Sequence, residues 1–138
     1  MKFLIASDHA GFELKQSLKA EFPQIEWIDL GTHSKESVDY PDFASNLCQS
    51  LPTLADHGVL ICGSGQGMAI KANRYKHIRA ALCWTPEVAE VARAHNDANV
   101  LCLGSRFIDL ANAKEILLRF SQTPFEGGRH QQRVNKLC

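Results

Sequence analysis

The sequence predicts a single α/β domain over residues 1–138, in which a doubly wound, five-stranded parallel sheet lies between two layers of helices. Two observations predict this fold. Five short apolar runs alternate with helical patterns along the chain. The runs are apolar throughout, as expected for parallel strands that are covered by helices on both faces. No compositional break marks a linker, and 138 residues suit a single hydrophobic core.

The predicted elements follow one another in a regular order. Strands are expected at 2–7, 26–30, 58–62, 79–83 and 99–104. Apolar residues three or four apart predict helices between and after them, at 10–22, 43–51, 68–75, 88–92 and 108–120. Pro41 and Pro86 stand where the second and fourth helices should begin, because the first turn of a helix tolerates proline. Pro124 precedes a polar tail, 125–138, which is expected to be helical in part.

The composition excludes several classes of partner. Lys and Arg together number 15, and so do Asp and Glu, so no net charge attracts nucleic acid or an anionic membrane. The first apolar run ends just before Asp8, so it is too short for the apolar part of a secretion signal or for a membrane span. Five cysteines without a CxxC pair argue against a disulfide framework and against a structural zinc site. A cytoplasmic protein with reduced thiols is expected.

Polar residues follow three of the predicted strands. Asp8 and His9 follow the first strand, 62–67 (CGSGQG) ends the third, and Arg106 follows the fifth. In an open doubly wound sheet, ligands bind beyond the carboxyl ends of the strands. The functional site is therefore expected at this edge of the sheet.

The glycine loop at 62–67 matches none of the common glycine motifs. A dinucleotide fingerprint would need glycine at Met68, and a nucleophile elbow would need glycine at Cys62. A P-loop would need Gly-Lys-Ser/Thr, which is absent. Closely spaced glycines before a helix still let backbone N–H groups surround an anion, and the helix start stabilises a thiolate. Cys62 is therefore a candidate base or nucleophile, although the loop could simply be a tight turn beside a buried thiol.

Other candidates have structural alternatives of similar weight. Asp8 could cap the helix at 10–22. His95 and Asn96 end the fourth helix, where both residue types are favoured, although histidine is also the natural acid or base near neutral pH. Arg106 could bind phosphate or form an ordinary ion pair.

The tail contains a second candidate binding element. If GGRHQQRV is helical, Arg129 and Arg133 lie four residues apart on one face, where like charges repel unless an anion lies between them. The planar guanidinium group suits phosphate, so the pair would form a clamp. The alternative is a solvated basic chain end.

Seven segments, in order along the chain, carry a resemblance to a known family. They are SDHAGFELK (7–15), DLGTHS (29–34), DYPDFA (39–44), LICGSGQG (60–67), ANR (72–74), RAHNDANVLCLGSR (93–106) and EGGRHQQRV (126–134). Together they resemble the ribose-5-phosphate isomerase B family, within the wider group that includes galactose-6-phosphate isomerase subunits. The resemblance implies interconversion of ribose 5-phosphate and ribulose 5-phosphate in the pentose phosphate pathway. It also implies a flavodoxin-like fold and a homodimer with sites at the subunit interface, a homotetramer being the alternative.

The resemblance implies proton transfer by Cys62. As a thiolate, Cys62 would carry a proton between C2 and C1 of the open sugar, through a cis-enediolate. The negative oxygen of that intermediate would meet the backbone N–H groups of the loop, which are those of Gly63, Ser64, Gly65, Gln66 and Gly67. Some relatives instead place a glutamate just after the loop, where this chain has Met68. The chain therefore resembles the cysteine group, and the Ser64 hydroxyl could hydrogen-bond the thiolate.

The resemblance also implies roles for the remaining candidates. His95 would take part in opening the furanose ring. Asp8 and Asn96 would bind sugar hydroxyls, and Tyr40 would line the pocket. The phosphate would be held by one histidine and three arginines, namely His9, Arg106, Arg129 and Arg133. No metal ion and no organic cofactor are implied.

Two alternative functions are weighed against this one. The first is isomerisation of a hexose 6-phosphate such as allose or galactose 6-phosphate, which differs only in the room needed for one more carbon. The second is a non-catalytic binding module, because flavodoxin-like sheets also bind flavin or phosphorylated ligands and a fold does not fix a function.

Overall fold

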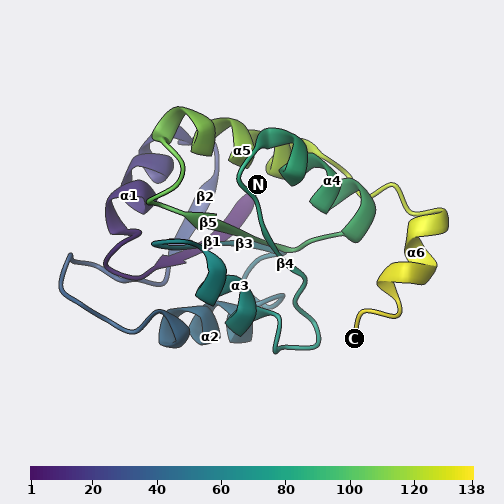
Figure 1. Cartoon of the computed structure of the whole chain (residues 1–138), viewed down its shortest axis with the longest axis horizontal. Coiled ribbons are helices and arrows are strands. Elements are labelled where there is room, and N and C mark those ends of the chain that lie inside the picture. The colour runs from purple at the N-terminus through teal and green to yellow at the C-terminus, as the bar shows by residue number, and fades with distance from the viewer.

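A parallel five-stranded sheet forms the centre of the structure, a computed structural model that describes residues 1–138 (Figure 1). The strands are β1 (Lys2–Ser7), β2 (Glu26–Asp29), β3 (His57–Cys62), β4 (Ala80–Leu82) and β5 (Val100–Gly104). The helices are α1 (Phe12–Glu21), α2 (Tyr40–Ser50), α3 (Gln66–Ala72), α4 (Pro86–Asn96), α5 (Leu110–Gln122) and α6 (Arg129–Val134). The predicted α/β fold with a helical tail is confirmed. No helix is both long enough and apolar enough to cross a membrane.

The strand order is β2-β1-β3-β5-β4, and every neighbouring pair is parallel. A flavodoxin-type sheet would place β4 beside β3. Here β5 takes that position, and the short β4 forms the edge. The register places Cys62 opposite Gly104 and Ser7 opposite Ile61. The carboxyl ends of β1, β3 and β5 are therefore adjacent, which brings together the three polar segments that follow them.

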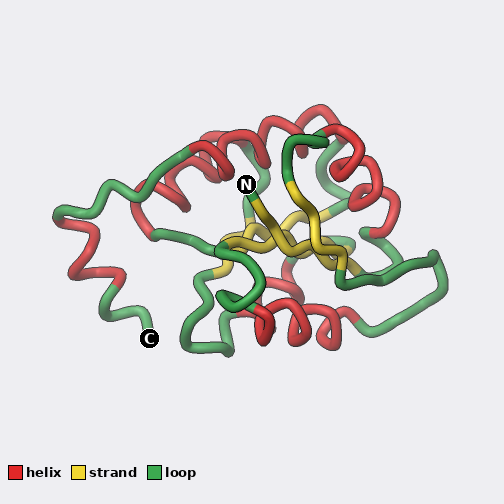
Figure 2. The backbone as a smooth tube through the Cα atoms, turned by 180° about the vertical axis from the view of Figure 1, so that it is seen from behind, coloured by secondary structure: helices red, strands yellow, loops and turns green.

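The helices cover both faces of the sheet. Helices α1, α4 and α5 lie on one face, and α2 and α3 lie on the other (Figures 1 and 2). Successive residues of β1 illustrate the two cores, because Phe3 and Ile5 pack toward α5 whereas Leu4 and Ala6 pack toward α2. Each fully buried side chain of this size contributes about 1.5 to 3 kcal/mol. Burial on both faces explains why the strands read as continuous apolar runs.

Polar caps set the helix starts, which differ from the predicted starts by up to three residues. Thr85 Oγ1 accepts a hydrogen bond from the Val88 N–H at the start of α4, and Asp109 plays the same part for α5. Pro41 and Pro86 lie in the first turns of α2 and α4, as predicted, although the first apolar residue of the α2 pattern is Phe43, three residues after the helix begins at Tyr40. Apolar spacing does not register a polar first turn, so it places the starts of such helices too late.

The tail lies apart from the layers. Helix α6 projects from the side of the molecule on which α4 ends, opposite the loops that follow the strands (Figures 1 and 2). The Glu126 N–H donates to the Ala94 carbonyl at 3.0 Å and ties the tail to the end of α4. The tail therefore belongs to the amino edge of the sheet.

Candidate active site

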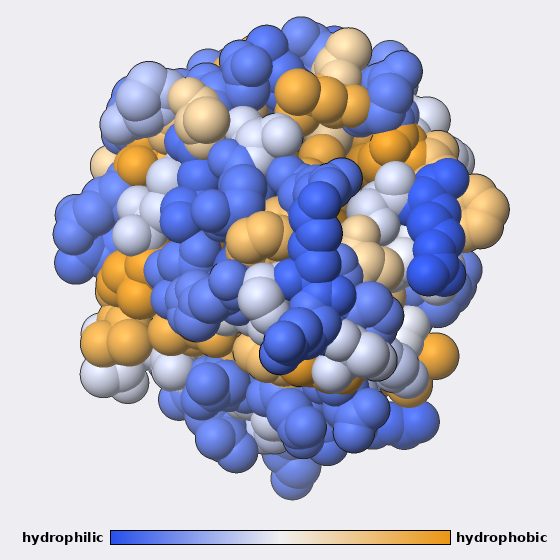
Figure 3. Space-filling view, turned by 90° about the vertical axis from the view of Figure 1, so that its left-hand side faces the viewer, coloured by the Kyte–Doolittle hydropathy of each residue, from blue (hydrophilic) through white to orange (hydrophobic).

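A shallow hollow of about 280 Å³ opens at the carboxyl edge of the sheet. It is lined by Asp8, Tyr40, Cys62, Gly63, Ser64, Gly67 and Arg106. Figure 3 looks onto this edge, where the surface is mainly hydrophilic and is interrupted by small apolar areas. Five of the seven lining residues follow β1, β3 or β5, Cys62 ends β3, and Tyr40 begins α2. The predicted position of the site is therefore a hollow with one thiol, one carboxyl group and one guanidinium group.

Cys62 ends β3, and its sulfur accepts a backbone hydrogen bond. The Gly65 N–H donates to Cys62 Sγ over 3.2 Å. Gly65 holds a φ of +76°, and a Cβ there would lie 2.5 Å from Leu82 Cδ1, so the turn requires glycine. An N–H group aimed at sulfur stabilises the thiolate more than the thiol, because hydrogen bonds to a charged acceptor are stronger.

The other buried cysteines lack this environment. Cys48, Cys83 and Cys102 lie among the apolar side chains of the two cores and do not line the hollow. Burial raises the pKa of Cys48 and of Cys83 to about 12, and it raises that of Cys102 well above its ordinary value. These three thiols stay protonated and serve as small hydrophobic residues.

The side chains of Ser64 and Gln66 form no hydrogen bond with Cys62. The Gln66 N–H donates to Ser64 Oγ at 3.3 Å, so this hydroxyl serves the start of α3 and makes no hydrogen bond with Cys62. The suggested link between the Ser64 hydroxyl and the thiol is therefore absent. The side chain of Gln66 lines a neighbouring hollow with Trp84 and Phe107. Its backbone N–H already donates to Ser64 Oγ, so Gln66 offers no free donor to the site.

Arg106 lies across the glycine loop. Its backbone N–H donates to the Gly63 carbonyl at 3.0 Å, and a Cβ on Gly63 would lie 2.8 Å from the guanidinium Nη1. Glycine at this position lets the guanidinium group pack directly over the loop. Arg106 forms no salt bridge with any carboxylate, so the alternative of an ordinary ion pair does not apply. A free positive charge therefore adjoins Cys62.

Asp8 and His9 are held by backbone hydrogen bonds. The Gly11 N–H donates to Asp8 Oδ1 at 3.1 Å, which stabilises the turn before α1. The N-cap residue of α1 is Gly11, and no side chain caps the helix, so the suggested capping role of Asp8 is wrong. Asp8 is buried, and it still lines the hollow with Cys62. The Val38 N–H donates to His9 Nδ1 at 3.2 Å. A ring nitrogen that accepts this bond carries no proton, so the neutral ring carries its proton on Nε2.

Tyr40 approaches the loop from α2. Its ring packs directly against Gly67, in space that a Cβ on that residue would fill. The side chain remains partly exposed and lines the hollow. Tyr40 thus closes one wall of the site, as expected.

Four predicted site residues lie elsewhere, on the amino side of the sheet. Helix α4 ends before β5 begins, so His95 and Asn96 are separated from Cys62 by the length of β5, about 13 Å for four residue steps. Arg129 and Arg133 lie on α6, one turn apart, and neither forms a salt bridge. One chain therefore presents two separate groups of candidate residues.

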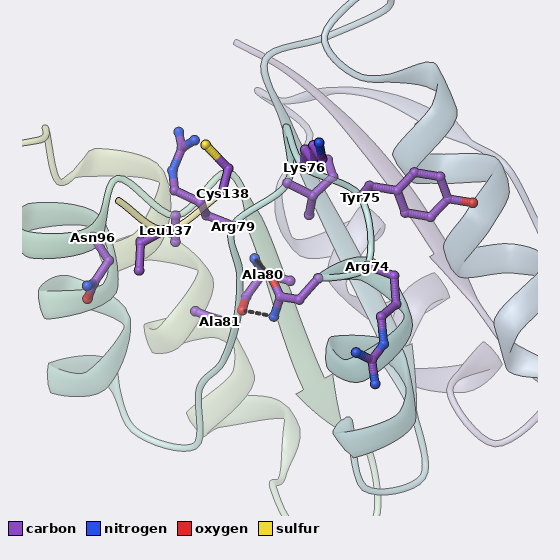
Figure 4. Close-up of a pocket in the computed structure, with 12 residues that line it drawn as sticks. Arg74, Tyr75, Lys76, Arg79, Ala80, Ala81, Asn96, Leu137 and Cys138 are labelled. Atoms are coloured by element: carbon purple, nitrogen blue, oxygen red, sulfur yellow. Dashed lines mark hydrogen bonds between the residues drawn. The ribbon is translucent and has the colours of Figure 1, made fainter. Parts of the chain in front are cut away.

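Asn96 lines a larger hollow of about 470 Å³ at this second edge (Figure 4). Figure 4 shows Asn96 beside Leu137 on one side and Arg74 with Tyr75 on the other. The αL position that ends α4 is occupied by Asp97, whose carboxylate bonds two arginines, rather than by Asn96. The amide of Asn96 has no hydrogen-bond partner within the chain and is free to meet a ligand.

Comparison with known proteins identifies the family. Residues 3–137 match the family described as Ribose/Galactose Isomerase. The chain belongs to that family. Ribose-5-phosphate isomerase B of Escherichia coli strain K12 is 43% identical over 139 residues, covering 99% of this chain and 93% of the relative.

Two solved isomerase structures match the fold over nearly the whole chain. A ribose 5-phosphate isomerase from Thermotoga maritima superposes with a TM-score of 0.96 at 52% identity, covering 99% of this chain and 96% of its own. Ribose-5-phosphate isomerase B from Mycoplasma genitalium, solved with bound ribulose-5-phosphate, gives 0.92 at 40% identity, covering 99% and 93%. This chain therefore shares its fold, in which β5 lies beside β3, with these isomerases.

Lys15 supports the site of this isomerase-family chain but is not among the predicted site residues. Its side chain is fully buried, and Nζ donates to Asp29 Oδ1 at 2.7 Å and to the Thr32 carbonyl at 2.5 Å. Burial alone would raise the pKa of Asp29, but the hydrogen bonds from Lys15, Lys19 and the Gly31 N–H outweigh it and lower that pKa. These bonds hold the start of the loop that carries Val38 to His9. The sequence did contain one signal for this role of Lys15. The residue lies three positions before Leu18, which places it on the apolar side of α1.

Proposed function

We propose that the chain interconverts ribose 5-phosphate and ribulose 5-phosphate, with Cys62 as the proton carrier. The observation that supports this most strongly is the hydrogen bond from the Gly65 N–H to Cys62 Sγ, at the edge of a hollow that also holds Arg106. The family membership supports the reaction class, and relatives named ribose-5-phosphate isomerase B support the substrate.

The proposed chemistry is a proton transfer within the substrate. The Cys62 thiolate takes the proton from C2 of the open aldose and returns it to C1, while the proton of the C2 hydroxyl passes to O1. Both hydrogens therefore end on the same sugar, and no external oxidant is needed. The cis-enediolate formed between the two steps bears a negative oxygen. The backbone N–H groups of Gly63, Ser64 and Gly67 are the proposed donors to that oxygen. Those of Gly65 and Gln66 already donate to Cys62 Sγ and Ser64 Oγ. Asp8 would bind sugar hydroxyls, and Tyr40 would form one wall of the pocket.

A second copy of the chain would complete the site. His95 and Asn96, for ring opening and hydroxyl binding, lie at the opposite edge from Cys62, as do Arg129 and Arg133 on α6. In a twofold dimer each residue contact is repeated by symmetry, so a contact between the Cys62 edge of one chain and the α6 edge of its partner would complete two identical sites. In such a homodimer the phosphate would lie among His9 and Arg106 of one subunit and the two tail arginines of the other.

Exposed apolar side chains support such an interface. Ile70, Trp84 and Phe107 are 58%, 59% and 76% exposed, respectively. Trp84 and Phe107 also line a hollow of about 450 Å³ that includes Ser64 of the glycine loop. Exposed aromatic residues of this size are typical of interface cores. Burial of this surface would place a partner subunit directly beside the Cys62 hollow.

The cellular setting is proposed from the same features. We infer that residues 1–138 act as one catalytic domain in the cytoplasm, within pentose phosphate metabolism. All five cysteines are free, which suits a reducing compartment.

The substrate is tested by comparing two sugar phosphates. Progress curves should give a higher kcat/KM for ribose 5-phosphate than for allose 6-phosphate. A large preference for the hexose would replace the proposed substrate while retaining the chemistry. Binding of either sugar without turnover, or a yellow protein that carries flavin, would favour the non-catalytic alternative.

A further inference from the structure

We propose that His95, Glu126 and His130 form a binding site for a transition-metal dication such as Zn²⁺, and that a metal ion there competes for His95. One atom from each of these side chains lies within 4.8 Å of the others. The residues come from two segments, since His95 lies in the last turn of α4, whereas Glu126 and His130 belong to the tail. A metal ion would therefore link the tail to α4.

The donor atoms already face one another. Glu126 Oε2 lies 3.9 Å from His95 Nε2, and Glu126 Oε1 lies 3.6 Å from His130 Nε2. The two imidazole rings stack with centroids 4.3 Å apart and planes 10° apart. A single carboxylate thus lies between two ring nitrogens, and both nitrogens are the Nε2 atoms that most often bind metals.

The geometry needs only small rotations to bind a metal. Zinc binds histidine nitrogen at about 2.0 to 2.1 Å, which places tetrahedral ligand atoms about 3.3 Å apart. The side chains of His95 and Glu126 are 43% and 56% exposed, so both can rotate toward the third ligand without disturbing the core. The Glu126 N–H bond to the Ala94 carbonyl meanwhile keeps the backbones together.

The donor set selects the class of metal. Two histidines and one glutamate, with water in the fourth position, form a known type of zinc site. Imidazole nitrogen favours Zn²⁺, Ni²⁺ and Cu²⁺ over Mg²⁺ and Ca²⁺, which prefer oxygen. The positive charges of Arg129 and Arg133 oppose a dication and argue for reversible binding.

The consequence for activity rests on the proposed function, in which His95 opens the sugar ring. A metal bound to His95 Nε2 occupies the lone pair that proton transfer requires. It also fixes the tail that carries Arg129 and Arg133. The bound metal would therefore inhibit the isomerase, and removal of the metal would restore activity.

The test is a direct titration in a Cys138→Ser background, which removes the exposed thiol as a competing ligand. Zn²⁺ is titrated by calorimetry and Co²⁺ by its visible absorption, with His130→Asn and Glu126→Gln as the ligand variants. His33→Asn, which alters an exposed histidine outside the cluster, is the matched control. We expect one ion per chain, and affinity at least about ten-fold weaker in both ligand variants, since even indirect partners of metal ligands are worth this much. The control should bind as the parent does.

Equal affinity in all variants, or no binding by the parent, would overturn the site. Inhibition is then measured as a fraction of each variant's own rate, with Zn²⁺ and with EDTA added afterwards. The parent should lose activity at the Zn²⁺ concentration that fills the site, and His130→Asn should need at least about ten-fold more. Zn²⁺ filling the site without loss of activity would overturn the competition for His95. A parent without isomerase activity would instead reject the proposed function, and the titration would still decide the metal site.

Discussion

The Gly65 N–H donates to Cys62 Sγ at 3.2 Å because Gly65 adopts a positive φ that turns its amide back toward the end of β3. The relationship joins the thiol to the glycine loop within a single turn. The same turn begins α3 at Gln66. The base and the proposed donors for the enediolate therefore have one common backbone support.

Replacement of Gly65 by alanine should impair both stability and turnover. A Cβ in the left-handed region costs about 1 to 2 kcal/mol, and the collision with Leu82 should add about 1 to 3 kcal/mol. Gly127→Ala is the matched control, because Gly127 has a φ of +67° and open space around it. Urea denaturation should show the larger loss for Gly65→Ala. Equal losses in the two variants would mean that the loop tolerates a side chain.

Removal of the thiol should abolish most of the activity without removing substrate binding. Cys62→Ser keeps the size of the side chain but replaces the thiol, which is the proposed proton carrier, with a hydroxyl group. We expect kcat to fall at least about 100-fold, the low end of what a positioned acid or base contributes. Cys138→Ser makes the same chemical change at an exposed position and should retain the parent rate. A fully active Cys62→Ser enzyme would exclude this residue as the base.

The tail arginines should bind the substrate phosphate. Arg129→Ala and Arg133→Ala should each raise KM, at a cost of about 1.5 to 3 kcal/mol for the charged hydrogen bonds lost. Lys136→Ala removes a positive charge from the same tail and should leave KM unchanged. Unchanged KM in both arginine variants would make the tail a solvated basic end.

Asp29 should make stability depend on pH in the acid range. Its pKa is lowered in the folded protein, so it stabilises the fold above its ordinary value of 3.8, and this contribution is lost as pH falls through the lowered value. Unfolding free energies between pH 6 and pH 2 should therefore fall more steeply for the parent than for Asp29→Asn. Parallel curves would show that the carboxylate is not selectively stabilised by Lys15 and Lys19.

The sequence was sufficient for the fold class but not for the strand order. Runs such as 58–62 are apolar at every position, which is the mark of a strand covered on both faces. An apolar run does not specify its neighbour in the sheet, so the exchange of β4 and β5 relative to a flavodoxin-type order was not predicted. That exchange is what places Arg106 beside Gly63.

The sequence was sufficient to nominate individual site residues, but it did not show which of them lie together in one chain. Asp8, Cys62 and Arg106 follow three strands, and the structure brings them to one hollow. His95 could have been assigned to the opposite edge, because the helix that carries it leads into the start of the last strand. The orientation of Ser64 depended on a local hydrogen bond to Gln66 that spacing does not reveal.

Subunit complementation tests the central claim most directly, since it asks whether Cys62 of one chain works with His95 of another. Cys62→Ser and His95→Asn are each expected to be nearly inactive alone. Random exchange of subunits in a twofold dimer gives mixed dimers with one intact site, so the mixture should recover about a quarter of the parent's ribose 5-phosphate isomerase activity. A mixture that exchanges subunits and stays inactive would contradict a site shared between chains.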